Sequence, residues 1–544
     1  MHIYYPLIQR IICCFSGIFI CFGLSGYSPE TKPKNESPGN ERMNHQEKIM
    51  YVVDVTKTYQ TIQNFGASDC WTAQFFGHFP DDKRNRMADW LFSMETDEQG
   101  QPKGIGLSLW RFNIGAGSLE QGELSRIPNA TRRGECFQLP DGTYDWKKQS
   151  GQRWFLAAAR KRGVGQFLAF NLSAPVYITH NGLANNWSRP KDGTFNLPKD
   201  KYVEFADFLA TVVAELEKRD TIPFLYLSPF NEPEWDWDGN TSQEGTPALL
   251  SEMAEITRLL DKKLTEKQLK TEILLTESGQ IDYLFRKNTD KPGRDNQIET
   301  FFNPVSPHYV GNLSHVPRRM AGHSYWSVTP VDSLYAKRKA LRKKLDEYGL
   351  NYWQTELCIM GTDTAIGGGR EKDLTMKTAL YIARIIHYDL CTANASAWHW
   401  WLGMTNSNYK DGLVYVTPNS DLTDGEIFDS KLMWTLGNFS RFVRPGAVRV
   451  DVSPSQTNPK DDSELMLSAF WHPKDKQLTI VIINTAEREQ TVKINLSGVK
   501  IKKWQSYVTS DRQGDNLRPV ETGTVNDPVR LPARSVTTLT GNRK

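Results

Sequence analysis

The stretch Phe224–Pro233, FLYLSPFNEP, decides how the chain is interpreted. Its first residues are rich in β-formers, which predicts a strand over residues 224–232. Pro233 lacks a backbone donor and restricts the residue before it, so the strand must end here with Glu232 at its exit. An acidic residue at the carboxyl end of a buried strand is typical of the working face of an α/β barrel.

The same organisation extends to both sides of this stretch. From about residue 60 to residue 440, short β-rich runs alternate with amphipathic stretches, which indicates parallel strands covered by helices. Helices are expected over 201–218, 249–264 and 375–390, where apolar residues recur at helical spacing. The eight expected strands predict the α/β class and a closed (β/α)8 TIM barrel. They are 62–68, 107–115, 164–174, 224–232, 271–278, 320–326, 351–357 and 395–401.

A second domain follows the barrel. After Arg444-Pro445-Gly446 the helical pattern disappears, and short alternating strands separated by turn residues indicate a β-sandwich. We therefore expect the catalytic barrel over residues 49–445 and a β-sandwich side domain over 446–544. Residues 49–58 include MYVVDV, which has strand character and is expected to pair with the sandwich. The side domain would then be built mainly from the C-terminus.

The N-terminal segment has the features of an export signal. Residues 11–24 form an apolar run of 14 residues between Arg10 and two small residues, which predicts a signal peptide over 1–26. The polar stretch 27–48 predicts a disordered linker. The protein is therefore expected to be secreted, periplasmic or at the cell surface. Lipidation of Cys21 is an open alternative that would add a membrane anchor.

Composition argues against several classes of partner. The 544 residues include 66 basic and 63 acidic ones, a balance that does not predict nucleic-acid binding. No phosphate-binding glycine motif occurs and the seven cysteines lack metal-site spacing, so neither a nucleotide cofactor nor a metal is expected. The aromatic content of 11%, with 16 Trp, suits either a large core or a sugar-stacking cleft.

A second carboxylate stands where another β-rich run ends. Glu356 closes the expected strand 351–357 and follows Glu232 by 124 residues, a separation that fits three β-α units. Two carboxyl groups at one barrel mouth are the minimal set for a glycosidase: one protonates the leaving oxygen, and the other attacks or activates water. Glu277, at the end of the fifth strand, is an alternative to Glu356 as the second catalytic carboxylate. We interpret it instead as a substrate-site or orienting residue.

Several motifs together resemble one known family. QNFGAS, SPFNEPEWDW, HSYW, WQTE and AWHWW, followed by the sandwich, resemble glycoside hydrolase family 30 over roughly residues 50–544. The resemblance implies a retaining enzyme with a (β/α)8 barrel and a β-sandwich side domain. SPFNEPEWDW followed by Gln243-Glu244-Gly245 looks most like the endo-β-1,6-galactanase branch, which cuts the β-1,6-galactan side chains of arabinogalactan. It also implies that Glu232 is the acid/base, Glu356 the nucleophile and Asn231 a contact to the sugar 2-hydroxyl.

The other site residues are expected around these two carboxylates. Arg111, an unusual charge inside a strand, and Tyr325 are expected to stabilise ionised Glu356. Tryptophans near strand ends are expected to stack on sugar rings. The expected substrate-binding set is Asn231, Arg111, Trp71, Trp235, Trp237, Glu277, His323, Tyr325, Trp398 and Trp400.

Two kinds of alternative remain open. A non-catalytic glycan-binding protein on the same fold should have lost one carboxylate, whereas this chain has both. Another activity within the family, such as β-1,6-glucanase, glucuronoxylanase or glucosylceramidase, would depend on loop shape, which sequence spacing does not resolve. Retaining hydrolysis requires the two carboxyl groups to lie about 5 to 5.5 Å apart.

Overall fold

The computed structural model describes residues 49–238, 242–454, 464–520 and 523–543. The expected signal peptide (1–26) and linker (27–48) lie outside these residues. Within the described ranges, no helix combines the length and the apolar character that crossing a membrane requires.

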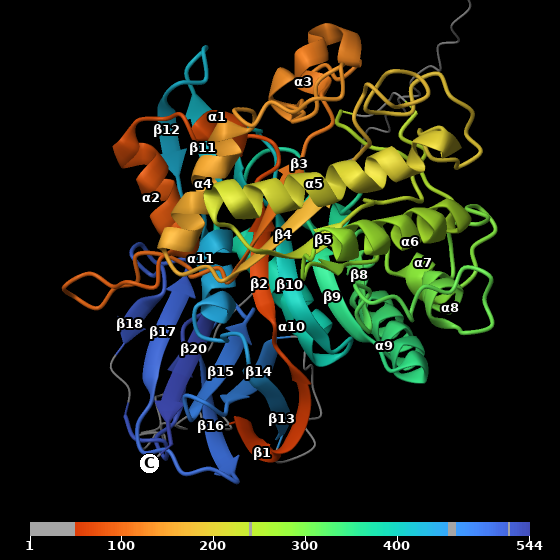
Figure 1. The fold of residues 1–544 in the computed structure, drawn as a ribbon. Coiled ribbons are helices and arrows are strands. Elements are labelled where there is room, and N and C mark those ends of the chain that lie inside the picture. The colour runs from red at the N-terminus through yellow and green to blue at the C-terminus, as the bar shows by residue number, and fades with distance from the viewer. Residues whose placement is uncertain (1–48, 239–241, 455–463, 521–522, 544) are drawn as a thin grey trace, which may run out of the picture. The chain divides into compact units, whose positions relative to one another are not determined.

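Eight β positions form a parallel barrel (Figure 1), as the sequence predicts. Each strand lies at one of the eight expected places along the chain, which confirms the (β/α)8 fold. In chain order the strands are β2 (Asn64–Ser68), β3 (Leu109–Ile114), β4 (Gln166–Asn171), β5 (Phe224–Ser228), β6 (Glu272–Ile273) with β7 (Thr276–Ser278), β8 (Arg319–His323), β9 (Asn351–Glu356) and β10 (Ala395–Thr405).

The barrel closes through its fifth position, which the sequence predicts as a single run over 271–278. The run is split: β6 pairs with β5 and β7 pairs with β8, so the strand order begins and ends in the same segment. The Leu274 N–H donates to the Leu227 carbonyl (2.9 Å), and the Leu275 carbonyl accepts from the Ala321 N–H (2.5 Å). The chain therefore changes partner strand between Leu274 and Leu275, and this change completes the barrel.

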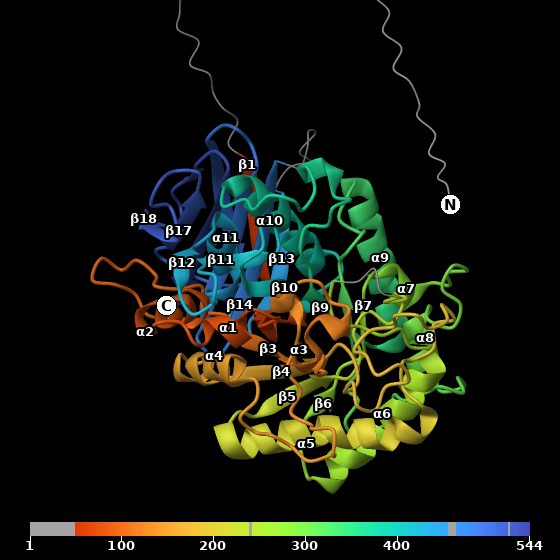
Figure 2. The ribbon, with the colours of Figure 1, turned by 90° about the horizontal axis from the view of Figure 1, so that it is seen from above.

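Helices cover the outside of the barrel (Figure 2), and α5 (Tyr202–Asp220), α6 (Leu250–Glu266) and α10 (Met376–Cys391) confirm the three expected ones. In α5, buried residues such as Phe205, Leu209 and Leu216 recur at helical spacing. The other α-helices are α1 (Ala73–Phe76), α2 (Asp81–Phe92), α3 (Ser118–Gln121), α4 (Ser150–Lys161), α7 (Asp282–Phe285), α8 (Gln297–Phe302), α9 (Val331–Tyr348) and α11 (Lys431–Ser440). Short 3-10 turns lie at Gly122–Ser125, Ala130–Arg132, Lys199–Lys201 and Thr364–Ile366.

Apart from β11 and β12, the remaining strands form the β-sandwich, in the order β18-β17-β20-β15-β14-β13-β1-β16-β19. β1 (Ile49–Thr61) is antiparallel to β13 and parallel to β16, so the N-terminal segment joins the side domain. A separate apolar core, which includes Val53, Ile480 and Leu539, lies within it. The other strands are β11 (Gly412–Pro418) and β12 (Gly425–Phe428), which extend from β10, and β13 (Val448–Pro454), β14 (Leu465–His472), β15 (Gln477–Asn484), β16 (Gln490–Ser497), β17 (Gln505–Ser510), β18 (Arg518–Val520), β19 (Val529–Leu531) and β20 (Ser535–Asn542).

A buried ion pair holds the loop that follows β8. Arg338 of α9 and Asp389 of α10 are fully buried, with 2.6 Å between Nε and Oδ1. Arg338 also donates to the Ser327 carbonyl (2.8 Å), and Asp389 accepts from the Trp398 indole N–H (2.9 Å). The pair therefore connects two helices, β10 and the β8 loop that carries Tyr325.

We expect Arg338→Met to lower the free energy of unfolding by about 3 kcal/mol, because it leaves the buried Asp389 without its charge partner. Arg342→Met is the matched control on the same helix: it breaks an ion pair with the mostly exposed Asp346, which should cost at most about 1 kcal/mol. Urea unfolding followed by tryptophan fluorescence measures both. Equally small losses in the two variants would contradict a structural role for the buried pair.

Candidate active site

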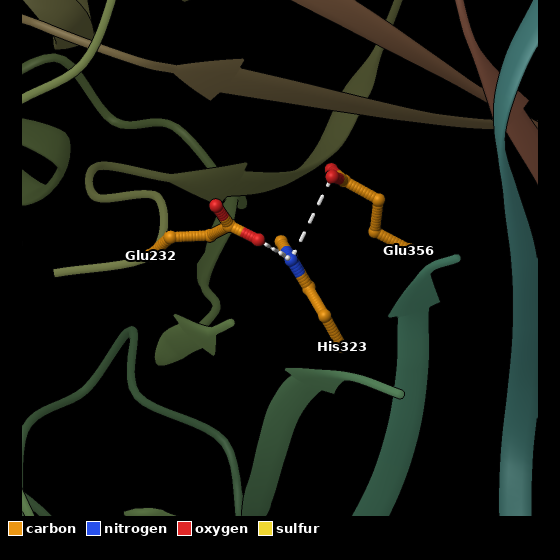
Figure 3. Close-up of side chains that lie close together, drawn as sticks. All are labelled: Glu232, His323 and Glu356. Atoms are coloured by element: carbon orange, nitrogen blue, oxygen red, sulfur yellow. Dashed lines mark hydrogen bonds and ion pairs between the residues drawn. The ribbon is translucent and has the colours of Figure 1, made fainter. Parts of the chain in front are cut away.

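Three ionisable groups meet at the carboxyl ends of the barrel strands. Glu232 follows β5, His323 ends β8 and Glu356 ends β9. One carboxylate oxygen of each glutamate and one ring nitrogen of His323 all lie within 4.8 Å of one another. Figure 3 shows the imidazole between the two carboxylates. The structure thus brings together the two carboxylates that the sequence singles out.

The backbone around Glu232 aims its side chain. Glu232 has a φ of +47° and Glu277 a φ of +55°, a left-handed conformation that residues with side chains rarely adopt. The Glu232 N–H donates to the Glu277 carbonyl (2.8 Å), and the Glu232 carbonyl accepts from the Trp237 indole N–H (3.1 Å). Such conformations cost roughly 1 to 3 kcal/mol and persist where the surroundings impose them, often at active sites.

Glu356 accepts hydrogen bonds from both of its expected partners. Arg111 Nη1 lies 3.1 Å from Oε2, and the Tyr325 hydroxyl lies 3.0 Å from Oε1. Burial raises the pKa of Glu356, while the positive charges of His323 and Arg111 oppose the increase. Two donors on the two oxygens fix the orientation of the carboxylate.

His323 connects Glu232 to Glu277. Its Nδ1 lies 3.0 Å from Glu232 Oε1 and its Nε2 lies 3.1 Å from Glu277 Oε2. A neutral imidazole donates from only one nitrogen, so carboxylates on both sides favour the doubly protonated ring. Burial opposes this charge, but the carboxylates of Glu356, Glu232 and Glu277 raise the pKa of His323 to about 10.

Glu277 anchors the other side of this imidazole. Burial opposes its ionisation, but Arg111 and His323, together with the Ser228 hydroxyl, lower the pKa of Glu277 to about 2. Ser228 donates to Oε1 (2.6 Å) and Thr355 donates to Oε2. Glu277 has no exposed surface. It therefore orients His323 and Arg111, and the alternative of a direct substrate contact does not hold.

The formal charges of this cluster balance when one carboxyl group is protonated. Arg111 and His323 supply two positive charges, and the three glutamates would supply three negative ones. One proton on a carboxyl group makes the cluster neutral and leaves one acid and one carboxylate facing each other. Glu232, His323 and Glu356 also have the spacing of a metal site. An imidazole protonated on both nitrogens, however, has no lone pair for a metal.

We expect the stability loss caused by His323→Gln to shrink as the pH rises from 7 to 10. The folded-state pKa of about 10 lies above the unfolded value of roughly 6.5. Charged His323 therefore contributes stability that is fully present below the unfolded pKa and is lost as the pH rises through the folded pKa. Melting temperatures measured across this pH range test the prediction.

His399 provides the control for this titration. It is equally buried in the barrel, where burial lowers its pKa to about 3, so it stays neutral between pH 7 and 10. The stability loss caused by His399→Gln should be the same throughout that range. If the stability loss caused by His323→Gln were also the same from pH 7 to pH 10, His323 would not carry a charge in the folded protein.

A cavity of about 460 Å³ opens over the carboxylate pair. Trp235, Trp237 and Trp326 line it together with Glu232 and Glu356. The rings of Trp235 and Trp326 meet at a steep angle with centroids 5.0 Å apart, and Trp326 is 36% exposed. Flat aromatic faces suit sugar rings. The other lining residues are Arg132, Ser242, Gln243, Tyr325, Cys358, Met360, Trp401, Tyr409 and Asp411.

The prediction that Trp398 and Trp400 stack on sugar is wrong. Both are fully buried: the Trp398 indole donates to Asp389 (2.9 Å) and the Trp400 indole donates to the Asp411 carbonyl (2.8 Å). Trp401, the next residue along β10, lines the cavity instead. Successive residues of a strand point to opposite faces. Applying this alternation to AWHWW would have separated Trp401 from Trp398 and Trp400.

Other expected substrate residues lie behind the cavity wall. Trp71 is 3% exposed and its ring meets the edge of Trp401, so it supports that side chain. Arg111 and His323 are fully buried and act on the carboxylates rather than on the substrate. Asn231 is also buried, and its Oδ1 has no hydrogen-bond partner in the described part of the chain. The cavity residues outside the expected set are Arg132, Ser242, Gln243, Trp326, Cys358, Met360, Trp401, Tyr409 and Asp411.

Known proteins share both the barrel and the sandwich of this chain. The profile of O-glycosyl hydrolase family 30 matches residues 48–415, and that of the family's β-sandwich domain matches residues 446–539. An endo-β-1,6-galactanase of Hypocrea rufa is 23% identical over 410 residues, which cover 72% of this chain and 74% of the relative. A glucuronoxylanase of Bacillus subtilis (strain 168) is 26% identical over 393 residues, which cover 68% and 76%.

A solved structure extends the comparison. The crystal structure of a conserved exported protein from Bacteroides fragilis has a TM-score of 0.82 and 34% identity, and the match covers 90% of this chain and 100% of that one. The family profiles together cover the barrel with its two strand-end glutamates and most of the side domain. The chain therefore belongs to O-glycosyl hydrolase family 30.

Proposed function

We propose that the protein is a retaining endo-β-1,6-galactanase that cleaves the β-1,6-galactan side chains of arabinogalactan. The observation that carries the retaining mechanism is the distance of no more than 4.8 Å between a carboxylate oxygen of Glu232 and one of Glu356. Retaining glycosidases hold their carboxyl groups about 5 to 5.5 Å apart, whereas inverting enzymes leave about 6.5 to 9.5 Å for a water molecule.

Each carboxyl group has one role in the proposed reaction. Glu232 protonates the glycosidic oxygen as the C–O bond breaks, and Glu356 attacks the anomeric carbon from the opposite face to form a covalent glycosyl-enzyme. Arg111 and Tyr325 orient Glu356 for this attack. Glu232 then accepts a proton from water, which displaces Glu356 and releases the sugar with its original configuration.

The galactan specificity rests on the Hypocrea rufa relative and on the SPFNEPEWDW motif. Incubation with de-arabinosylated arabinogalactan, β-1,6-glucan and glucuronoxylan tests it, with the products separated by chromatography. Release of short galacto-oligosaccharides from the first substrate alone is the expected result. Release of monosaccharide only would contradict endo action, and cleavage of another polymer instead would contradict the galactan assignment.

Glucuronoxylan is the second candidate substrate, because the Bacillus subtilis relative that acts as a glucuronoxylanase is 26% identical to this chain. Both candidates use the same pair of carboxylates, so they differ only in what the cavity accepts. The polymer comparison decides between them in one experiment.

We also propose that residues 1–26 are a signal peptide that directs export and is then removed. Residues 27–48 are the linker between this signal peptide and the barrel. The apolar run 11–24 and the exported protein from Bacteroides fragilis support this proposal. Mass spectrometry of the mature N-terminus in cell fractions tests it. A chain that starts near residue 27 outside the cytoplasm is expected, and an acylated chain that starts at Cys21 would show a membrane anchor instead. Full-length protein in the cytoplasm would contradict export.

A further inference from the structure

Asp411 is a buried carboxylate on the wall of the active-site cavity, and the proposed reaction does not use it. It lies between β10 and β11, is 2% exposed and lines the same cavity as Glu232 and Glu356. Its Oδ1 has no hydrogen-bond partner among the residues that the structure describes. A buried acceptor without a donor is unfavourable. A hydroxyl group bound in the cavity would supply the missing donor.

The surroundings hold Asp411 in place. Its backbone carbonyl accepts from the Trp400 indole N–H (2.8 Å), and the preceding Lys410 donates from Nζ to the carbonyls of Gly368 (2.9 Å) and Arg370 (2.7 Å). The backbone that carries the carboxylate is therefore held in place before any ligand binds. A preorganised acceptor loses little conformational freedom when a ligand donates to it.

Arg132 is the charged neighbour of this carboxylate. Its Nη2 lies 3.9 Å from Asp411 Oδ2, a contact too long for a hydrogen bond. Arg132 is itself held by a hydrogen bond to Ser242 Oγ (2.8 Å) and by its position over the Trp71 ring, 5.1 Å from the centroid. Burial raises the pKa of Asp411 to about 7, even though the charge of Arg132 and a hydrogen bond from the Thr405 side chain act against this. The protein alone therefore leaves the carboxylate incompletely stabilised.

We propose that Asp411, assisted by Arg132, accepts hydrogen bonds from hydroxyl groups of the sugar bound in this cavity and determines which sugar the enzyme prefers. This inference rests on the proposed function, because it assigns a specificity residue to the same site. The ligand class is a neutral glycan whose hydroxyls lie against the cavity wall. A site built to bind a hydroxyl strongly rejects an analogue without it, because the acceptor is then left buried and unpaired.

Oligosaccharide binding to a chain that cannot turn over tests the proposal. Titration calorimetry of the full-length Glu356→Gln protein with β-1,6-galactotriose, β-1,6-glucotriose and β-1,4-xylotriose identifies the preferred sugar. Adding Asp411→Ala should weaken binding of that sugar at least 10-fold and reduce the preference among the three. Adding Asp411→Asn, which keeps one acceptor oxygen, should weaken it less, by about 3-fold.

Asp515→Asn is the control, because Asp515 is equally buried but lies in the sandwich, where Ser510 and Arg518 bind it. It should leave the affinities unchanged. If Asp411→Ala does not fold, Asp411→Asn carries the test, with its own expected loss of about 3-fold and a reduced preference among the three sugars. A preference among the three sugars that stays unchanged, whatever the change in affinity, would overturn the role of Asp411.

The outcomes also separate this inference from the proposed substrate. If the protein prefers glucotriose or xylotriose and loses that preference in the Asp411→Ala variant, this result would overturn the galactan assignment and support the role of Asp411. A preference for galactotriose that is the same with and without Asp411→Ala would support the galactan assignment and overturn the role of Asp411. Failure of all three sugars to bind the Glu356→Gln protein at millimolar concentration would overturn both.

Discussion

Glu356→Gln should lower kcat for β-1,6-galactan on the order of 10⁴-fold or more, because an amide cannot attack the anomeric carbon. The amide has the shape of the carboxylate: its oxygen can accept from Arg111 while its NH2 group donates to the Tyr325 hydroxyl oxygen, so the melting temperature should change by only a few degrees. Reducing-sugar release measures the rate. Glu347→Gln, at a half-exposed position on α9, is the control and should leave kcat unchanged.

A smaller variant tests the chemical role of Glu356. In Glu356→Gly, azide can enter the vacated space and attack the anomeric carbon from the face opposite the leaving group. An activated aryl β-galactobioside should then give an α-glycosyl azide. If Glu356→Gln retained wild-type activity, or if azide produced only the β-azide, another group would have to be the nucleophile.

Glu232→Gln should lower kcat for galactan by about 10³-fold, because the sugar leaving group needs a proton that the amide cannot supply. With a dinitrophenyl β-galactobioside the leaving group departs unprotonated, so the first step should stay fast. The second step should become slow, since it needs Glu232 as a base. Stopped-flow absorbance should therefore show a burst of dinitrophenolate followed by slow turnover.

Azide also reports on the role of Glu232. It needs no base, so it should accelerate the slow phase of Glu232→Gln and give a β-glycosyl azide, the opposite configuration to that expected from Glu356→Gly. Equal loss of the first-step rate on galactan and on the dinitrophenyl substrate would contradict the acid role. The two variants together assign the carboxylates independently of each other.

Local signals in the sequence were sufficient for the fold and for placing Glu232 and Glu356 at the barrel mouth. Pro233 ends a β-rich run directly after Glu232, and Glu356 ends another run three β-α units later, so both residues could be placed at the barrel mouth. The sandwich and its N-terminal strand were visible as a change from helical to alternating patterns. The split of the fifth strand was not visible, because it depends on which neighbours Leu274 and Leu275 meet when the barrel closes.

The aromatic and polar walls of the site were harder to predict. Trp398, Trp400 and Trp401 lie within four residues of one another, and only the direction in which each points from β10 separates core from cavity. Arg132 and Asp411 come from loops far apart in the chain, and no local motif marks either one. Glu277 stands at a strand end as Glu356 does, and only the structure, in which Glu356 lines the cavity and Glu277 does not, distinguishes the orienting residue from the catalytic one.

The configuration of the first product tests the proposed mechanism most directly. Proton NMR can follow the anomeric signal of the new reducing end during the first minutes of galactan cleavage, before mutarotation. With carboxylate oxygens of Glu232 and Glu356 no more than 4.8 Å apart, we predict that the β-anomer appears first and the α-anomer only later. Initial appearance of the α-anomer would mean direct attack by water and would contradict a covalent intermediate on Glu356.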